Sequence, residues 1–349
     1  MKNRNKFYSI ALVSISLITF LIPFSFMASS APVKSASPNI TETYITANDS
    51  VWGFPAICGD RIVWLDNRNN NGSLPYQNLN IYMYNISTSK ETRITNSESV
   101  ISSPAIYGDR IVWNDNHNGT GDIYMYNIST SKETRITTSG SVDYGNAPAI
   151  YGDRIVWLDN RNDDGDSKWD IYMYNISTSK ETRITTDGSA SNPVIYGDRI
   201  VWIDGCNGNG SNIFMYNIST HKETQITTNA VAFDPAIYGD RIVWDDYRNG
   251  DYGDIYMYDL SISKEARITT NGSDQKIPSI YGDRVLWLDN RNGDGYSNWD
   301  VYMYDLSTSK ETRITTDGSA SSPAIYGDRI VWANRDVYMV TLRSRCEIT

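Results

Sequence analysis

The stretch YGDRIVWLDNRN, from Tyr151 to Asn162, decides the fold because near copies of its core recur along the whole chain. GDRIVW also begins at Gly59, Gly108, Gly197, Gly239 and Gly327, and GDRVLW begins at Gly282. Successive copies lie 42 to 49 residues apart, a period typical of solenoids and propellers. The chain is therefore expected to be a repeat protein with seven units.

Each repeat is expected to contain four short β-strands. In the third repeat these are APAIY (147–151), RIVWLD (154–159), DIYMYNI (170–176) and ETRIT (181–185), all rich in β-branched or aromatic residues. Gly152-Asp153 suits a two-residue type II′ hairpin turn, and NISTSK suits a second hairpin. No helical apolar period occurs after the N-terminal leader, so the sequence predicts an all-β chain of antiparallel strands.

The middle strands, RIVW and IYMY, are apolar on both alternating faces, so both faces of each small sheet must be covered. Repeated sheets of this kind are the blades of a propeller. We predict a single seven-bladed β-propeller of four-stranded antiparallel blades over residues 42–349. ETYIT (Glu42–Thr46) is expected to close the ring as the outer strand of the last blade, with CEIT (Cys346–Thr349) as the alternative.

The N-terminus has the layout of an export signal. Lys2, Arg4 and Lys6 precede an apolar run over 8–26, and small residues follow it. We predict a signal peptide over residues 1–31, or an uncleaved N-terminal anchor, and a linker over 32–41. The chain is thus expected outside the cell or at its surface, with no membrane span beyond the N-terminal segment.

The charge excludes one class of partner. Removing the leader's three positive charges takes the formal net charge from −10 to −13, and the remaining Lys and Arg are scattered by the repeat. Nucleic-acid binding needs clustered cations, so no nucleic acid is expected. Cys58, Cys206 and Cys346 share no spacing pattern and are expected to lie far apart in the ring, so no disulfide is predicted.

SPAIYGDRIVWANRDVYM (322–339) and DNRNGDGYSNWDVYMYDLSTSKETRIT (Asp289–Thr315) resemble the TolB-like propeller repeat. The resemblance extends from residue 42 onward, and it is strongest to propellers of archaeal cell-surface proteins associated with the surface layer. It implies a binding platform, an assembly module or, more rarely, an enzyme. The best-known members of this family have six blades, whereas seven repeats are present here.

Strand order predicts two rims. The Gly-Asp and Ser-Thr-Ser-Lys turns share one, which we name the turn rim, and the variable loops share the other, the loop rim. Long loops occur in repeats one, three and six, and variation on one face usually marks the binding face. Aromatic faces beside planar hydrogen-bonding groups suit sugar rings, so seven residues are predicted to bind a ligand: Trp169, Trp299, Tyr296, Arg161, Arg291, Asp159 and Asp289. The alternative is that each Trp caps its own blade.

The same loops have part of a calcium-binding pattern. Oxygen-bearing side chains alternate before a glycine in two of them, but no Glu follows at the twelfth position. The alternative is that Asn and Gly provide turns with positive φ. The residues concerned are Asn160, Asn162, Asp164 and Gly165 in one loop, and Asn290, Asn292, Asp294 and Gly295 in the other.

Histidine is scarce: His117 and His221 are the only two, and the repeat places them on opposite rims. No catalytic triad or metal site can be assembled from them. We therefore expect no catalytic residue, no metal, no cofactor and no enzyme activity. The predicted function is an exported, non-catalytic binding or assembly module for cell-surface polysaccharide or surface-layer proteins. The alternatives are a structural tile of the surface layer and, third, a polysaccharide-processing enzyme.

Glycosylation is a further expectation for an exported chain with many Asn-x-Ser/Thr sequons. Four of them belong to the repeated NIST turn, where Asp259 and Asp305 take the place of Asn in other repeats. The ten sequons are Asn39, Asn48, Asn71, Asn85, Asn118, Asn127, Asn175, Asn209, Asn217 and Asn271.

Overall fold

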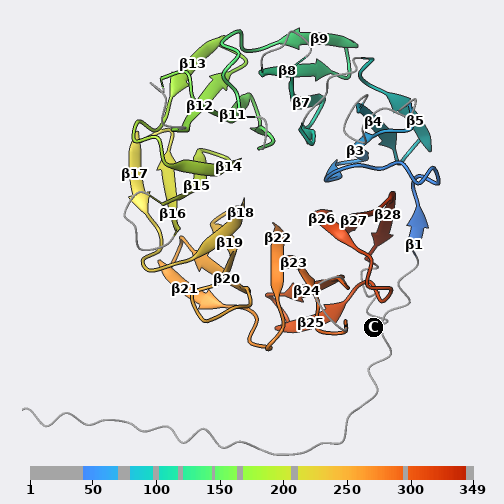
Figure 1. Cartoon of the computed structure of the whole chain (residues 1–349), viewed down its shortest axis with the longest axis vertical. Helices are drawn as coiled ribbons and strands as arrows, with labels where there is room; N and C mark the ends of the chain where they lie inside the picture. Colours follow the sequence, from blue (N-terminus) through green and yellow to red (C-terminus); the bar gives the residue numbers. More distant parts are fainter. Residues whose placement is uncertain are drawn as a thin grey trace, which may run out of the picture. The chain divides into compact units, whose positions relative to one another are not determined.

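The computed structural model describes residues 42–69, 79–96, 102–116, 121–143, 146–162, 168–205, 211–293 and 298–342. By contacts the chain divides into residues 1–37 and 38–349, and all described residues belong to the second unit. Within these described ranges, twenty-eight strands form seven four-stranded antiparallel sheets arranged as the blades of a propeller (Figure 1). The predicted all-β, seven-bladed fold is confirmed. Among the residues that the structure describes, none forms a helix that could traverse a bilayer.

The blades follow chain order, and the first strand of each blade is the innermost. Blade one contains β2 (Ala56–Cys58), β3 (Arg61–Asp66), β4 (Asn80–Asn85) and β5 (Lys90–Arg93). Blade two contains β6 (Ala105–Tyr107), β7 (Arg110–Asp115), β8 (Asp122–Asn127) and β9 (Lys132–Arg135). Blade three contains β10 (Ala149–Tyr151), β11 (Arg154–Asp159), β12 (Asp170–Asn175) and β13 (Lys180–Arg183). Blade four contains β14 (Ala190–Tyr196), β15 (Arg199–Asp204), β16 (Asn212–Asn217) and β17 (Lys222–Gln225). Blade five contains β18 (Ala232–Tyr238), β19 (Arg241–Asp246), β20 (Asp254–Asp259) and β21 (Lys264–Arg267). Blade six contains β22 (Gln275–Tyr281), β23 (Arg284–Asp289), β24 (Asp300–Asp305) and β25 (Lys310–Arg313). Blade seven contains β26 (Ser321–Tyr326), β27 (Arg329–Asn334), β28 (Asp336–Thr341) and the N-terminal β1 (Glu42–Tyr44).

β1 closes the ring as the outer strand of blade seven. It pairs antiparallel with β28, with Glu42 opposite Val340 and Tyr44 opposite Tyr338. Immediately after β1, the Thr46 hydroxyl donates to Asp336 Oδ1 at 2.8 Å and accepts from the Val337 amide at 2.9 Å. Of the two strands proposed for closure, the N-terminal one is therefore confirmed. Residues 346–349 lie outside the described part of the chain.

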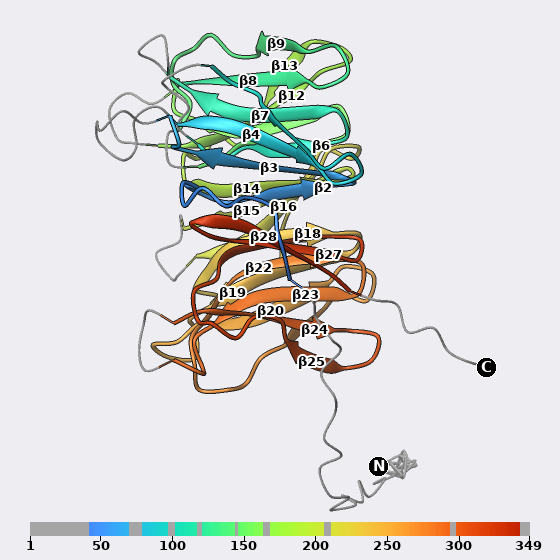
Figure 2. The ribbon, with the colours of Figure 1, turned by 90° about the vertical axis from the view of Figure 1, so that its right-hand side faces the viewer.

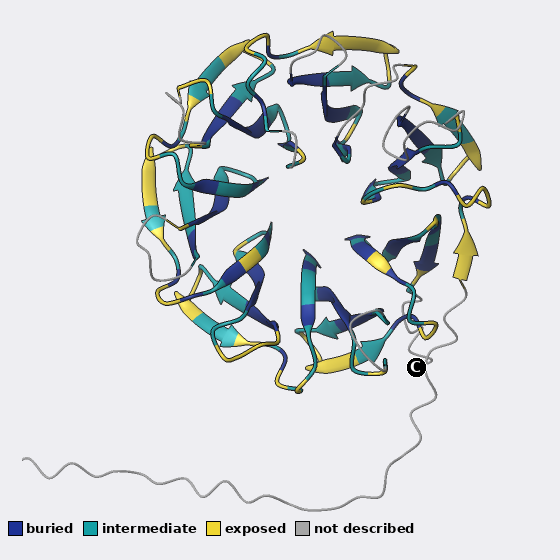
Figure 3. Ribbon diagram, in the orientation of Figure 1, coloured by how far each residue is buried: buried dark blue, intermediate teal, exposed yellow. Residues whose placement is uncertain are grey.

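The hydrophobic core lies between neighbouring blades, because the two middle strands of each blade are apolar on both faces. Val156 and Leu158 of β11, for example, share a cluster with Ile195, Ile200 and Trp202 of blade four. The second strand of each blade is almost entirely buried, the innermost strands are mostly half-buried, and the outer strands are half-buried to exposed (Figure 3). Six tryptophans of the repeated motif are almost completely inaccessible to solvent: Trp64, Trp113, Trp157, Trp202, Trp244 and Trp287.

The strands run between the two rims (Figure 2). At the turn rim, Tyr151 pairs with Arg154 across Gly152-Asp153, and Gly152 has φ +59°, which a side chain would disfavour. This agrees with the predicted type II′ turn. The Ser-Thr-Ser-Lys turn leaves four residues between Asn175 and Lys180, and the Asn175 side-chain oxygen accepts from the Thr178 amide.

The turn rim also links each blade to the next through one arginine. Arg110 Nη1 of blade two, for example, donates to the Gly152 carbonyl oxygen at 3.0 Å and to Asp153 Oδ1 at 2.6 Å in blade three. Arg329 completes the circle by binding Gly59 and Asp60 of blade one. We name these contacts the arginine latch. The seven arginine–glycine pairs are Arg61–Gly108, Arg110–Gly152, Arg154–Gly197, Arg199–Gly239, Arg241–Gly282, Arg284–Gly327 and Arg329–Gly59.

Cys58 is a free cysteine on the innermost strand of blade one, half-buried. It stands where the other six blades have a tyrosine. Cys206 and Cys346 lie outside the described residues, so the absence of a disulfide stays a prediction.

Candidate functional site

Asp159 and Arg161, two of the predicted ligand-binding residues, form a network within blade three. Asp159 is fully buried and accepts hydrogen bonds from Trp157 Nε1, the Ser141 hydroxyl, and the amide and guanidinium of Arg161. Arg161 Nη1 also contacts Glu181 at 2.6 Å, and its guanidinium lies over the Tyr172 ring, 4.3 Å from the centroid. This network joins the loop rim to the outer strand of the blade.

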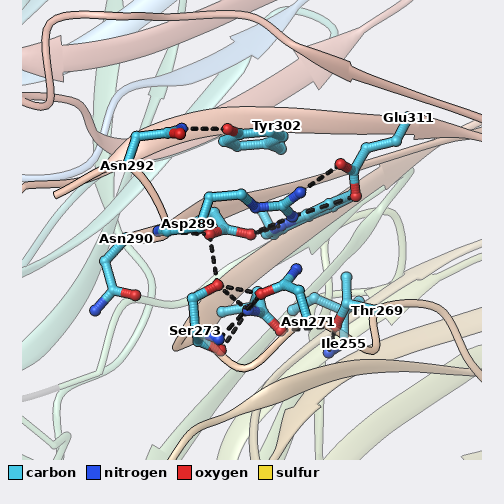
Figure 4. Close-up of polar contacts among 12 residues, drawn as sticks. Ile255, Thr269, Asn271, Ser273, Asp289, Asn290, Asn292, Tyr302 and Glu311 are labelled. Atoms are coloured by element: carbon cyan, nitrogen blue, oxygen red, sulfur yellow. Dashed lines mark hydrogen bonds and ion pairs between the residues drawn. The ribbon is translucent and has the colours of Figure 1, made fainter. Parts of the chain in front are cut away.

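The same network recurs around Asp289 and Arg291 in blade six. Figure 4 shows Asp289 beside Ser273, with Glu311 and Tyr302 on the strands beyond. Burial alone would raise the pKa of Asp289, but hydrogen bonds from Arg291 and Trp287 outweigh it and hold the pKa below its usual value. Blades one and five repeat the arrangement around Asp66–Arg68 and Asp246–Arg248. Asp159, Asp289, Arg161 and Arg291 thus stabilise the loop rim, and their ligand-binding role stays a prediction.

Trp169 and Trp299 are half-buried at the start of the third strand of their blades. Trp169 packs against the core between blades three and four, and its amide donates to the Gly188 carbonyl oxygen at 3.0 Å. Trp299 packs against the core between blades six and seven, and Lys276 Nζ lies 3.8 Å from its ring centroid. This packing favours the blade-cap alternative, and sugar binding by either residue stays a prediction.

Several predicted residues fall outside the described part of the chain: Tyr296, and Asp164, Gly165, Asp294 and Gly295 of the calcium pattern. Asn162 and Asn292, which are described, donate through their side-chain amides to the hydroxyls of Tyr172 and Tyr302. Within the described ranges, no three His, Cys, Asp or Glu side chains are grouped so as to hold a metal ion.

Substituting the two tryptophans separates the cap from the binding role. Trp169→Ala and Trp299→Ala are each expected to lower the free energy of unfolding by about 2 kcal/mol, because a half-buried ring is lost from a blade interface. Chemical denaturation of both variants measures this, with Trp52→Ala, which removes a more exposed ring, as the control. Unchanged stability together with weaker sugar binding would instead support the sequence-based binding prediction.

The loop rim also presents exposed aromatic side chains that the sequence analysis did not single out. The exposed fractions are 42% for Trp52, 51% for Phe54, 45% for Phe233 and 46% for Tyr252. Trp52, Phe54 and Phe233 lie at the loop-rim ends of the innermost strands, and Tyr252 lies between β19 and β20. These four aromatic residues could have been recognised from the sequence, because none of them belongs to the motif shared by the seven repeats.

A pocket of about 390 Å³ opens at the loop rim where blade five meets blade six. Phe233 and Tyr247 stand edge to face in it, with ring centroids 5.6 Å apart. A Cβ on Gly253 would lie 2.9 Å from Tyr247 Cζ, so glycine there leaves room for the phenol. The lining residues are Val231, Phe233, Asp234, Asp245, Tyr247 and Lys276.

Asp245 is the unusual member of this pocket. It is only 2% exposed, and no described residue forms a hydrogen bond with its Oδ1. Burial, reinforced by the nearby Asp234, raises its pKa well above the usual value. The aspartate replaces a residue that is apolar and buried in most other blades (Leu65, Leu158, Ile203, Leu288 and Ala333). A buried carboxyl group that is incompletely hydrogen-bonded, at a position where other blades have a core leucine, indicates that Asp245 has a functional role and does not serve packing alone.

Comparison with known proteins shows the fold. No family model and no curated protein matches this sequence. TolB from Acinetobacter baumannii matches with a TM-score of 0.53 and 16% identity, over 82% of this chain and 66% of TolB. An oligogalacturonate lyase from Vibrio parahaemolyticus matches with a TM-score of 0.66 and 10% identity, over 88% of this chain and 95% of the lyase. The β-propeller domain of the trilobed protease from Pyrococcus furiosus matches with a TM-score of 0.66 and 12% identity, over 86% of this chain and 98% of that domain.

These matches establish a TolB-like β-propeller fold, here with seven blades. They also correct one expectation. From the sequence no enzyme activity was expected, yet enzymes are among the proteins with this fold, including oligogalacturonate lyases and an acylaminoacyl peptidase. The scarcity of histidine was therefore a poor reason to exclude catalysis. At identities of 10–13%, the similarity to these enzymes shows the fold alone and does not indicate whether this chain has catalytic residues.

Proposed function

We propose that this chain is an exported binding platform at the cell surface and that its loop rim takes a carbohydrate, such as a cell-surface polysaccharide. One observation carries the proposal: of the five large aromatic side chains that are exposed among the described residues, Trp52, Phe54, Phe233 and Tyr252 lie on the loop rim, and the fifth, Tyr44, lies on the outer strand β1. Aromatic rings provide flat apolar faces at low conformational cost, and exposed apolar groups gathered on one face mark interaction sites.

The turn rim offers a contrast that strengthens this assignment. Its polar groups are used in the arginine latch and in contacts such as Ser177 with Asp153, and these repeat from blade to blade. Ile262 is the large apolar residue exposed at this rim, in the turn of blade five. A repeated, internally bonded surface serves the ring, whereas the irregular loop rim distinguishes one blade from another.

The basic N-terminal segment followed by an apolar run supports export. The likeness of the repeat to propellers of archaeal surface-layer proteins adds a second proposed setting, in which surface-layer proteins are the partners. The narrower alternative, a structural tile of the surface layer, is favoured by the regular turn rim, through which copies or neighbours would pack. Binding of sugars at the loop rim distinguishes the platform from the tile.

A glycan array probed with the full chain tests the platform, followed by titration of the strongest sugar against variants. Phe54→Ala and Phe233→Ala should each weaken binding about 2- to 10-fold, since a stacking contact contributes about 0.5–1.5 kcal/mol beyond its buried area. Ile262→Ala on the turn rim is the matched control and should bind as the unmodified chain does. An array without any bound sugar would remove the carbohydrate proposal.

A further inference from the structure

We propose that the pocket between blades five and six binds the protonated amino group of an amino sugar within that carbohydrate. This inference rests on the proposed function and specifies the part of the ligand that occupies the pocket. The contacts that carry it belong to Asp245, Asp234, Phe233 and Tyr247, which line the pocket together.

Asp245 supplies the first contact. Its Oδ1 is buried and has no hydrogen-bond partner, and it belongs to a residue that lines an open pocket. An unpaired buried acceptor destabilises the protein unless a donor reaches it. A ligand ammonium group has three N–H donors and a positive charge, so it satisfies this oxygen and favours the ionised carboxylate.

Asp234 supplies the second acidic group. It is held with a positive φ of 43° at a β-bulge of β18, and Asn192 of blade four donates to its Oδ1 at 3.3 Å. A non-glycine residue in this conformation is strained, and such positions persist where the surroundings fix them. The bulge places Asp234 among the residues that line the pocket with Asp245.

The remaining charges leave the pocket acidic. Asp274 is near Asp245 and Tyr247, and its negative charge adds to the larger effect of burial in raising the pKa of both groups. Lys276 is the cation of the pocket, and its Nζ lies over the Trp299 ring. The pocket lining therefore contains two carboxyl groups and one ammonium group, with the Asp274 carboxyl group nearby, and a second ammonium group from a ligand improves the balance.

The aromatic pair selects the rest of the ligand. Phe233 is exposed at the pocket and stands at right angles to Tyr247. An aromatic face accommodates both the apolar face of a pyranose ring and an adjacent cation. A sugar with a free amine at one carbon offers both groups within one ring, which a neutral sugar does not.

Asp245→Leu is the decisive variant, because leucine is the residue that blades one, three and six have at this position. The variant is therefore expected to fold with an unchanged or higher melting temperature. Asp234→Asn is a second variant, chosen because Asn192 occupies the corresponding position of blade four. Neither substitution touches the exposed aromatic residue Phe54, which belongs to the platform.

The probes are glucosamine oligomers and N-acetylglucosamine oligomers of the same length, titrated against the full chain by calorimetry. The amine form is expected to bind at least 10-fold more tightly, and Asp245→Leu should abolish this difference while leaving the acetylated form unaffected. The affinity for the amine should rise with pH as Asp245 and Asp234 ionise, and should fall once the amino group of the ligand loses its own proton. Asp274, Tyr247 and Lys276 are the other titratable groups at the pocket. Binding should also release a proton, which titration in buffers of different ionisation enthalpy detects.

Equal affinity for the two oligomers would overturn the amino-sugar inference and leave the platform intact. Tighter binding of a lysine-bearing peptide than of the glucosamine oligomer would also overturn it, because the pocket would then recognise a protein. A preference for the amine that survives in Asp245→Leu would place the amine elsewhere. The glycan array tests the platform separately, because the platform is supported by any sugar whose binding is weakened in Phe54→Ala.

Discussion

Deletion of residues 42–48 is expected to lower the free energy of unfolding by about 4 kcal/mol or more, in the range of the most damaging changes known for single sites. The deletion removes β1, which pairs with β28, and Ile45, which packs into the core between blades seven and one. It also removes Thr46, whose hydroxyl bonds to Asp336 and to the Val337 amide. β28 then becomes the unpaired outer edge of blade seven.

Urea denaturation measures the change in the free energy of unfolding. Two single substitutions test the same strand in case the truncated chain does not fold. Thr46→Val keeps the strand but removes its two side-chain hydrogen bonds, and it should lower the free energy of unfolding by about 1–3 kcal/mol. Tyr44→Ala changes a side chain that is 65% exposed and should have little effect. If the truncated chain melts at the same temperature as the complete chain, β1 does not close the ring in solution.

Asp289→Ala is expected to lower the free energy of unfolding by about 3 kcal/mol. The substitution leaves the Trp287 indole, the Ser273 hydroxyl and the Arg291 guanidinium without their shared acceptor. Removing one partner of a buried pair costs about 3–5 kcal/mol, and the lower end applies because Arg291 is partly exposed and can be solvated. Chemical denaturation measures the loss. Asp305→Asn is the matched control, because four other blades have Asn at that position.

The same substitution alters the response to acid. The pKa of Asp289 is lower in the folded chain than in the unfolded one, so its contribution is complete above about pH 4 and is lost as the pH falls through the folded-state pKa. Melting temperature should therefore fall less steeply below pH 4 in Asp289→Ala than in the unmodified chain. Parallel curves would show that Asp289 is not the low-pKa group that its hydrogen bonds indicate.

Much of the fold was predictable because the strand and turn pattern of one blade occurs seven times in the sequence. The Gly-Asp turn determines the first hairpin of each blade. The two middle strands, which are apolar on both faces, determine how neighbouring blades pack. The closing strand was predictable as well, since ETYIT at Glu42–Thr46 matches the outer strand of the other repeats. Even so, repetition alone could not exclude the C-terminal alternative.

The candidate site was predicted less well. Asp159 and Arg161 were selected because charged residues near an aromatic suggest sugar binding, but the structure shows Arg161 bonded to Asp159 and Glu181 and stacked on Tyr172. These partners lie on other strands, so their engagement depends on strand pairing that local sequence does not display. Asp245 was overlooked although RIVWDD differs from RIVWLD by one letter. Its importance appears only when the position is known to be buried.

The arginine latch has a consequence for how the number of units is set. Each latch recognises a glycine carbonyl and, in six of the seven junctions, an aspartate carboxylate, which every unit offers in the same form. The contact therefore carries no information about which unit is the correct neighbour, and a duplicated unit could join without any new chemistry. The order of the units along the chain sets which blades are neighbours, and the single N-terminal strand β1 ends the series by pairing with β28. The arginine latch therefore sets no barrier of its own to the gain or loss of one whole repeat by recombination.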